Sequence, residues 1–227
     1  MSYMSYILKL LKNNFLLTLL SFMKSKNWVN RQKNDQFVKK AKQLGYINRA
    51  AFKLEEIEQK YKIIENSKEI LELGSSPGGW TQVILNYNTK SNVICFDLLD
   101  MKMNNQRIAF YKEDFLKFNF TNLKNKFYLV LSDVAPNTTG HQSTDHLRIC
   151  QLIYEVIDRL EIILKKQGSF IFKIWKGEEE KEIIKMLKKI FDKVEYFKPK
   201  SSRQESSEIF IISRGFRLSL IHISEPT

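Results

Sequence analysis

A glycine-rich turn at residues 74–80 is the segment whose residue types point most clearly to ligand binding. It reads Gly-Ser-Ser-Pro-Gly-Gly-Trp and follows an apolar run at 69–73, so Gly74, Gly78 and Gly79 lie where a strand is expected to lead into a helix. Glycines there let the backbone approach a ligand at the carboxyl edge of a parallel sheet. The turn has neither the Gly-Lys-Ser/Thr ending of a P-loop nor the G-x-G-x-x-G dinucleotide pattern. A nucleotide-like cofactor without phosphates fits better, and S-adenosylmethionine is such a cofactor.

Two acids follow the turn in the order in which this cofactor would need them. Asp97 ends an apolar run at 92–96, at the separation where an acid commonly binds ribose hydroxyls. Asp114 follows the next run and is placed to meet the adenine amino group. Either acid taken alone is more simply a helix cap or a solvated turn residue. Their succession after one glycine-rich turn favours cofactor binding.

Apolar, β-branched runs alternate with segments of helical periodicity along the rest of the chain. The clearest helical segment is 147–164, and a second amphipathic helix is expected at 181–193. Alternating strands and helices predict an α/β fold with a mostly parallel sheet covered by helices on both faces. The seven expected strands are 69–73, 92–96, 107–111, 127–132, 169–174, 194–197 and 208–213.

The composition predicts one globular domain with a polyanionic partner. The chain has 227 residues, of which 43% are hydrophobic, enough for one core but hardly for two. Lys and Arg outnumber Asp and Glu by 37 to 25, which gives a net charge of +12 and favours nucleic acid over an acidic membrane surface. A lysine-rich composition inherited from an AT-rich genome is the alternative. Cys95 and Cys150 form no CxxC pair, so a reducing compartment and no structural zinc are expected.

The two ends of the chain differ from the middle. The first 34 residues contain six Lys or Arg and no acid, and their apolar residues recur at helical spacing. We interpret 1–24 as a mitochondrial or plastid targeting leader, because no A-x-A cleavage site supports a secretory signal. If it is instead an amphipathic helix of the domain, the protein belongs in the cytoplasm or nucleus. Its apolar stretches are shorter than the roughly 20 residues of a membrane span. Residues 216–227 form a tail resembling translated adapter sequence, and we assign it no function.

Six ordered motifs resemble the FtsJ/RrmJ family of ribosomal RNA 2'-O-ribose methyltransferases. The resemblance runs from residue 28 to residue 215 and implies a Rossmann-like class I methyltransferase, using S-adenosylmethionine, with a central seven-stranded sheet across a domain at 25–215. Two departures are small, since Glu72 stands where an aspartate is commoner and Ser75-Ser76 replaces a pair of alanines. The motifs are 48–54, 74–80, 95–99, 131–137, 168–173 and 201–209.

The resemblance also implies roles for single residues. The catalytic tetrad of the family maps to Lys53, Asp133, Lys173 and Glu208. Its cofactor contacts map to Gly78, Trp80, Asp97, Asp114 and Asp133.

Lys173 is the best candidate to act on the ribose hydroxyl. Methyl transfer is an in-line displacement, so an enzyme must hold the oxygen about 3 Å from the methyl carbon and help a weakly acidic hydroxyl lose its proton. Lys173 ends an apolar strand, where burial favours a neutral amine that can act as a base. The carboxylates of Asp133 and Glu208 favour the ammonium, which would orient the hydroxyl instead. Both roles stay open.

Basic residues on either side of the tetrad are expected to bind RNA phosphates. They are Arg31, Lys39 and Arg49 before Lys53, and Lys200 and Arg203 before Glu208. Tyr46 could stack on a base. His141 and His146 share a segment without a third ligand, so no metal site is predicted.

The resemblance implies an enzyme that methylates a uridine ribose in large-subunit ribosomal RNA, and we expect it to act as a monomer without metal or membrane insertion. A methyltransferase of the tRNA anticodon loop is the nearest alternative. An inactive RNA-binding assembly factor is a third reading, which the intact tetrad disfavours. A nicotinamide-dependent dehydrogenase would require the pyrophosphate loop that the chain lacks.

Overall fold

The computed structural model describes residues 34–136 and 139–217. The chain divides into two compact units, 1–45 and 46–227, which are described separately. In the first unit, helix α2 (Gln36–Gln43) begins after Asp35, whose carboxylate caps it by accepting the Phe37 N–H at 3.0 Å. Lys39 lies on α2. The predicted leader at 1–24, Arg31 and residues 218–227 of the predicted tail lie outside the described residues.

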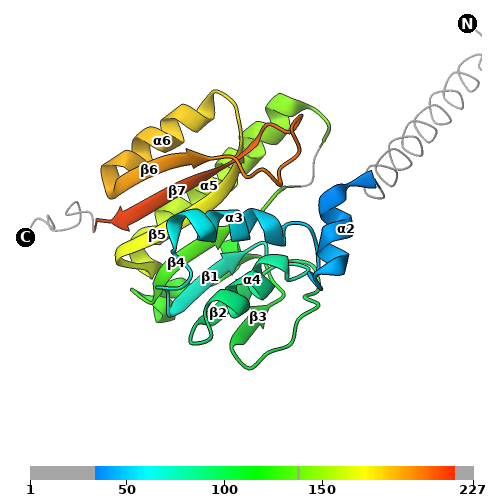
Figure 1. The fold of residues 1–227 in the computed structure, drawn as a ribbon. Helices are drawn as coiled ribbons and strands as arrows, with labels where there is room; N and C mark the ends of the chain where they lie inside the picture. The colour runs from blue at the N-terminus through cyan, green and yellow to red at the C-terminus, as the bar shows by residue number, and fades with distance from the viewer. Residues whose placement is uncertain (1–33, 137–138, 218–227) are drawn as a thin grey trace, which may run out of the picture. The chain divides into compact units, whose positions relative to one another are not determined.

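The second unit is built on a seven-stranded sheet with the strand order β3-β2-β1-β4-β5-β7-β6 (Figure 1). β7 runs antiparallel to both of its neighbours, and the remaining neighbouring pairs are parallel. This confirms the predicted, mostly parallel α/β sheet. The strands are β1 (Glu69–Leu73), β2 (Asn92–Phe96), β3 (Ile108–Tyr111), β4 (Phe127–Ser132), β5 (Leu164–Trp175), β6 (Phe191–Phe197) and β7 (Glu208–Phe216).

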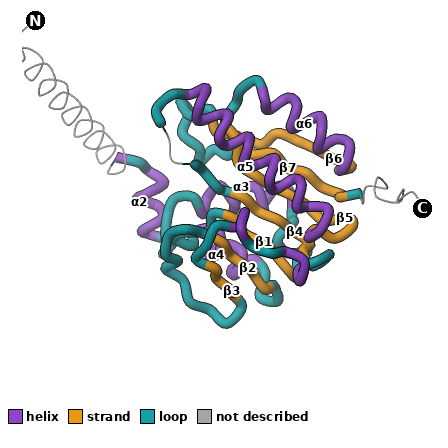
Figure 2. Tube along the Cα trace, turned by 180° about the vertical axis from the view of Figure 1, so that it is seen from behind, coloured by secondary structure: helices purple, strands orange, loops and turns teal. Residues whose placement is uncertain are grey.

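Helices cover both faces of this sheet, as the alternating pattern predicted (Figures 1 and 2). Helices α3 (Ala51–Tyr61) and α4 (Gly79–Tyr87) pack on one face, and α5 (Gln142–Ile163) and α6 (Glu179–Ile190) pack on the other. Successive strand residues point to opposite faces, so β1 sends Ile70 into the α3–α4 core and Leu71 into the α5–α6 core. No helix in the described ranges is long and apolar enough to cross a membrane.

Several element boundaries differ from those predicted. The helix expected at 147–164 is α5, which begins at Gln142 and gives way directly to β5 at Leu164. The helix expected at 181–193 ends at Ile190, because β6 starts at Phe191. Apolar residues continue across both junctions with no Gly or Pro between the elements, so the pattern alone did not separate helix from strand. β7 continues past the expected end at 213 to Phe216, which is fully buried.

Candidate active site

The glycine-rich turn packs against the chain that leaves β4, at the carboxyl edge of the sheet. Gly74 has φ +77°, and a Cβ there would lie 2.9 Å from the backbone nitrogen of Val134. Since a backbone atom cannot move aside cheaply, glycine is required. The Asp133 N–H also donates to the Leu73 carbonyl at 3.1 Å. The turn and Asp133 are therefore neighbours where the strand order reverses between β1 and β4, the usual ligand position in a doubly wound sheet.

The two predicted cofactor acids are placed differently. Asp97 is half-buried beside the turn and accepts the N–H groups of Ser76 and Leu99, each at 2.8 Å. A carboxylate oxygen has a second lone pair, so Asp97 can hold the turn and accept a ligand hydroxyl as well. Asp114 caps the short 3-10 helix η1 (Phe115–Lys117) by accepting the Leu116 N–H at 3.1 Å. The structure thus shows a capping role for Asp114, and its adenine contact stays a prediction.

Trp80 connects the turn to the helix that carries Lys53. Its side chain is only 3% exposed, its ring lies 5.6 Å from that of Phe210, and its indole N–H donates to the Ala50 carbonyl at 2.9 Å. Ala50 is the residue before α3. The Trp80 side chain therefore positions α3. A direct contact of Trp80 with the cofactor would then have to come from the backbone of Trp80.

Gly79 also lies where the segment before α3 packs on α4. A Cβ on Gly79 would lie 2.1 Å from Oδ1 of Asn48, the oxygen that accepts the Ala50 N–H at 3.0 Å. The Ile47 N–H is also bound, by Oε1 of Gln82 at 2.9 Å. Segment 47–50 is thus docked on α4, and the absence of a side chain at Gly79 makes room for it.

Lys173 and Asp133 form the first half of the predicted tetrad. Lys173 lies on β5 and is 8% exposed. Its Nζ lies 2.6 Å from Asp133 Oδ1 and donates a hydrogen bond to the Asp133 carbonyl oxygen at 2.8 Å. The contact with the carboxylate is an ion pair without hydrogen-bond alignment. The carbonyl and the carboxylate of one residue together fix the direction of the amine.

Lys53 and Glu208 form the second half. Lys53 Nζ donates to Glu208 Oε2 at 2.8 Å and lies 2.7 Å from Oε1. The hydroxyl of Ser202 donates to Oε1 at 2.8 Å. Lys53 comes from the first turn of α3 and Glu208 from the start of β7, so the pair joins a helix to the sheet beneath it.

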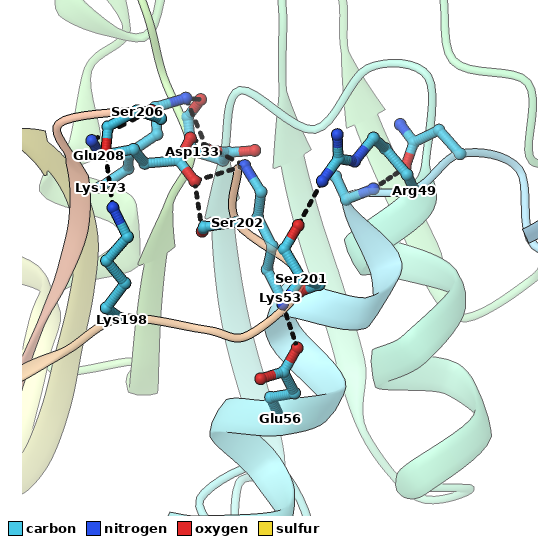
Figure 3. Close-up of polar contacts among 12 residues, drawn as sticks. Arg49, Lys53, Glu56, Asp133, Lys173, Lys198, Ser201, Ser202, Ser206 and Glu208 are labelled. Carbon is cyan, nitrogen blue, oxygen red and sulfur yellow. Dashed lines mark hydrogen bonds and ion pairs between the residues drawn. The ribbon is translucent and has the colours of Figure 1, made fainter. Parts of the chain in front are cut away.

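Phe210 brings the two pairs together. It is the register partner of Lys173 across β5 and β7, and Lys53 Nζ lies 5.8 Å from the centre of its ring. Glu208 and Phe210 share a sheet face because they are two residues apart on one strand. All four predicted tetrad residues therefore converge on the α3–α4 face near the carboxyl edge of the sheet (Figure 3).

Glu72 is a buried acid in the floor of the site that the sequence analysis noted only as a departure from the family. It is 1% exposed, and Thr81 Oγ1 donates to its Oε2 at 2.6 Å. Burial, with the nearby carboxylates of Asp133 and Asp97 adding to it, raises the pKa of Glu72 to about 8, although the Thr81 hydrogen bond opposes the shift. An acid within an otherwise apolar run was the signal that marked this position.

The predicted RNA-binding residues differ in how far their side chains are engaged within the protein. Arg49 donates from its guanidinium to the Ser201 carbonyl, so part of its hydrogen-bonding capacity holds the protein together. The side chain of Lys200 is exposed and Arg203 is half-buried, both in the loop before β7. Tyr46 is half-buried, with its hydroxyl donating to Glu55 and its ring set edge-on to Phe52. A stacking role for Tyr46 stays a prediction.

His141 and His146 are the two histidines among the described residues. Among the described residues, no group of three or more His, Cys, Asp or Glu side chains could hold a metal ion. His146 is buried with its Nε2 3.6 Å from the sulfur of Cys150, and burial raises the pKa of this thiol to about 11. His141 is exposed at the start of α5.

Comparison with known proteins agrees with this geometry. The model of the FtsJ-like methyltransferase family matches residues 46–216. The chain belongs to the FtsJ-like methyltransferase family. The resemblance inferred from six motifs is thereby confirmed, and the tetrad and glycine-rich turn described above all lie within the matched FtsJ-like region.

Relatives of this FtsJ-like chain cover most of its length. Ribosomal RNA large subunit methyltransferase E of Gluconobacter oxydans is 40% identical over 200 residues, which are 84% of this chain and 72% of the relative. The protein of the same name from Rickettsia bellii is 38% identical over 199 residues, or 83% and 88% of the two chains. A crystal structure described as a ribosomal RNA methyltransferase from Plasmodium falciparum superposes with a TM-score of 0.66 at 29% identity, covering 75% of this chain and 98% of that one.

Proposed function

We propose that the protein transfers a methyl group from S-adenosylmethionine to the 2'-hydroxyl of a uridine in large-subunit ribosomal RNA. The observation that carries this proposal is the convergence of two ion pairs, Lys173–Asp133 and Lys53–Glu208, beside the glycine-rich turn. The names of the bacterial relatives and the net charge of +12 support an RNA substrate.

The residues around the turn fit S-adenosylmethionine. The carboxylates of Asp97 and Asp133 flank the turn, and they suit a ligand that carries a ribose diol and two positive charges. Turn residues 74–80 include no basic side chain, which suits a ligand without phosphates. When bound, the cofactor supplies an electrophilic methyl group.

The protein side chains then act on the RNA. Lys173 Nζ, fixed by both the carbonyl and the carboxylate of Asp133, holds the 2'-hydroxyl oxygen in line with the methyl group. As a neutral amine it accepts the hydroxyl proton when the new O–C bond forms, and as an ammonium it orients the hydroxyl, which then releases its proton to solvent. The Lys53–Glu208 pair, held over Phe210, supplies a second fixed pair of charges beside the acceptor. Because these groups are positioned before substrate arrives, they need little reorganisation during transfer.

Asp97→Ala should weaken the binding of S-adenosylhomocysteine by about 10-fold or more, since the variant loses a charged acceptor for the ribose and releases the Ser76 N–H that shapes the turn. Titration calorimetry measures this. Asp100→Ala is the matched control, because Asp100 lies on the same loop and its exposed carboxylate pairs with Lys112 at 2.6 Å. An unchanged Kd in Asp97→Ala would contradict the assignment.

Methyl transfer from labelled S-adenosylmethionine tests the function directly. Ribosomal subunits, free ribosomal RNA and tRNA are offered in parallel, and the modified nucleoside is identified by mass spectrometry. A 2'-O-methyluridine in large-subunit RNA is expected. Label in tRNA would support the anticodon-loop alternative, and cofactor binding without transfer to any RNA would support an assembly factor.

We also propose that residues 1–24 direct the protein to mitochondria and that it acts as a monomer. The support for targeting is the basic, acid-free composition of the first 34 residues. A fluorescent protein fused to residues 1–24 should accumulate in mitochondria, whereas plastid, cytoplasmic or nuclear fluorescence would favour the alternatives.

A further inference from the structure

The loop between β6 and β7 is fastened to the helix that carries Lys53. The carboxylate of Glu56 accepts the backbone N–H groups of Lys200 at 2.6 Å and of Ser201 at 2.8 Å. Arg49, which precedes α3, donates to the Ser201 carbonyl (Figure 3). Glu56 lies three residues after Lys53 and therefore on the same side of α3. Helix α3 thus carries both the catalytic candidate Lys53 and Glu56, which holds the loop.

This loop delivers Ser202 to the carboxylate of Glu208. Ser202 is 6% exposed, and its hydroxyl donates to Glu208 Oε1 at 2.8 Å. Lys53 donates to the other oxygen, Oε2, at 2.8 Å. The backbone of Glu208 is held as well, because its N–H donates to the hydroxyl of Ser206 at 3.1 Å.

Two donors restrict a carboxylate more than one does. The terminal torsion of glutamate is broad. Lys53 Nζ lies close to both oxygens, but it stands at the end of a long side chain and can follow the carboxylate as it rotates, so the ion pair by itself does not fix the carboxylate plane. The donor from Ser202 fixes the plane, because it holds Oε1 from a short side chain on a loop that is itself bound to Glu56. The orientation of the Lys53 ammonium therefore depends on the Ser202 hydroxyl, through the carboxylate of Glu208.

We propose that Ser202 is a positioning residue, which acts through Glu208 to direct Lys53 and is itself held in place by the contacts of Glu56 with the loop. This inference rests on the proposed function, because the orientation of Lys53 matters for turnover only in a methyltransferase. Ser202 contributes to turnover and not to cofactor or RNA affinity.

The first test compares neighbouring serines. Ser202→Ala should lower kcat by about 10-fold, with less than about a twofold change in KM for RNA and in Kd for S-adenosylhomocysteine. Ser202→Thr, which retains a hydroxyl, should recover most of the loss. Ser201→Ala is the matched control, because Ser201 is fully buried in the same loop and its hydroxyl has no hydrogen-bond partner within residues 34–136 and 139–217. Equal kcat values for Ser202→Ala and Ser201→Ala would overturn the proposal.

A double substitution separates positioning from a general structural effect. If Ser202 acts through Glu208, Ser202→Ala should cost less than about twofold when introduced into Glu208→Gln. A further loss of about 10-fold in that background would show that Ser202 acts independently and would overturn the proposal.

A readout without catalysis distinguishes this inference from the proposed function. The acetylation rate of Lys53, followed by mass spectrometry, should rise several-fold in Ser202→Ala and stay unchanged in Ser201→Ala, because a loosened pair exposes the amine more often. Unchanged labelling in Ser202→Ala would overturn the positioning role. Increased labelling in a protein that methylates no RNA would support the positioning of Lys53 and overturn only the proposed function.

Discussion

Lys173→Ala should reduce methyl transfer by about a thousandfold while the Kd for S-adenosylhomocysteine changes less than about twofold. The amine of Lys173 is the most buried basic group of the tetrad, and Asp133 fixes it through two oxygens. The amine lies 2.6 Å from the Asp133 carboxylate, so Lys173→Ala also removes the cation of this ion pair. Single-turnover transfer, with cofactor affinity measured separately, tests this expectation.

Two further lysine variants make the result specific. Lys176→Ala removes an exposed lysine just beyond the end of β5 and should keep turnover within about twofold of the wild type. Lys173→Arg keeps the charge but replaces a compact ammonium with a planar fork, so it should remain strongly impaired. Thermal unfolding must show that Lys173→Ala is folded, because it leaves Asp133 without its cation. Turnover near the wild-type value in folded Lys173→Ala would remove Lys173 from the mechanism.

Much of the fold was predictable because several of the buried strands are short apolar runs. β1, β2 and β4 were located to the residue, since turn or polar residues bound them. The junctions at Leu164 and Phe191 were not predictable in the same way. There the chain passes from helix to strand without a breaker, and only the hydrogen bonds of the sheet decide which residues join it.

The residues of the site were predictable from motifs, but their pairing was not. Lys53 and Glu208 are 155 residues apart in sequence, and nothing in the motifs indicates that Lys53 pairs with Glu208 while Lys173 pairs with Asp133. Arg49 shows a second limit. Its charge suggested RNA binding, which stays a prediction, and the sequence did not reveal that its guanidinium also donates to the Ser201 carbonyl. Glu56 looked like one of several helix acids, and its role depends on a loop that is distant in sequence.

Glu72 should make the stability of the folded protein fall as the pH rises from about 5 to about 8. Burial raises its pKa from the ordinary value of 4.5 to about 8, so within this window the folded chain holds a proton that the unfolded chain has released. Stability decreases with pH wherever the folded state binds more protons. The loss of stability is complete above the folded pKa and amounts to about 5 kcal/mol at roughly 1.36 kcal/mol per pKa unit.

Glu72→Gln should remove this part of the pH dependence, because a neutral amide has the shape of the protonated acid and does not titrate. Urea unfolding of wild type and variant at several pH values from 5 to 8.5 measures it, and the difference between the two proteins cancels the contributions of Glu58 and Asp145, whose pKa values are raised and lowered respectively. Glu69→Gln, at the half-buried start of the same strand, is the matched control. The Glu72→Gln variant should gain stability relative to wild type as the pH rises. If the difference in unfolding free energy between the two proteins is constant across the range, Glu72 is ionised in both the folded and the unfolded chain. The floor of the site would then hold a fixed negative charge.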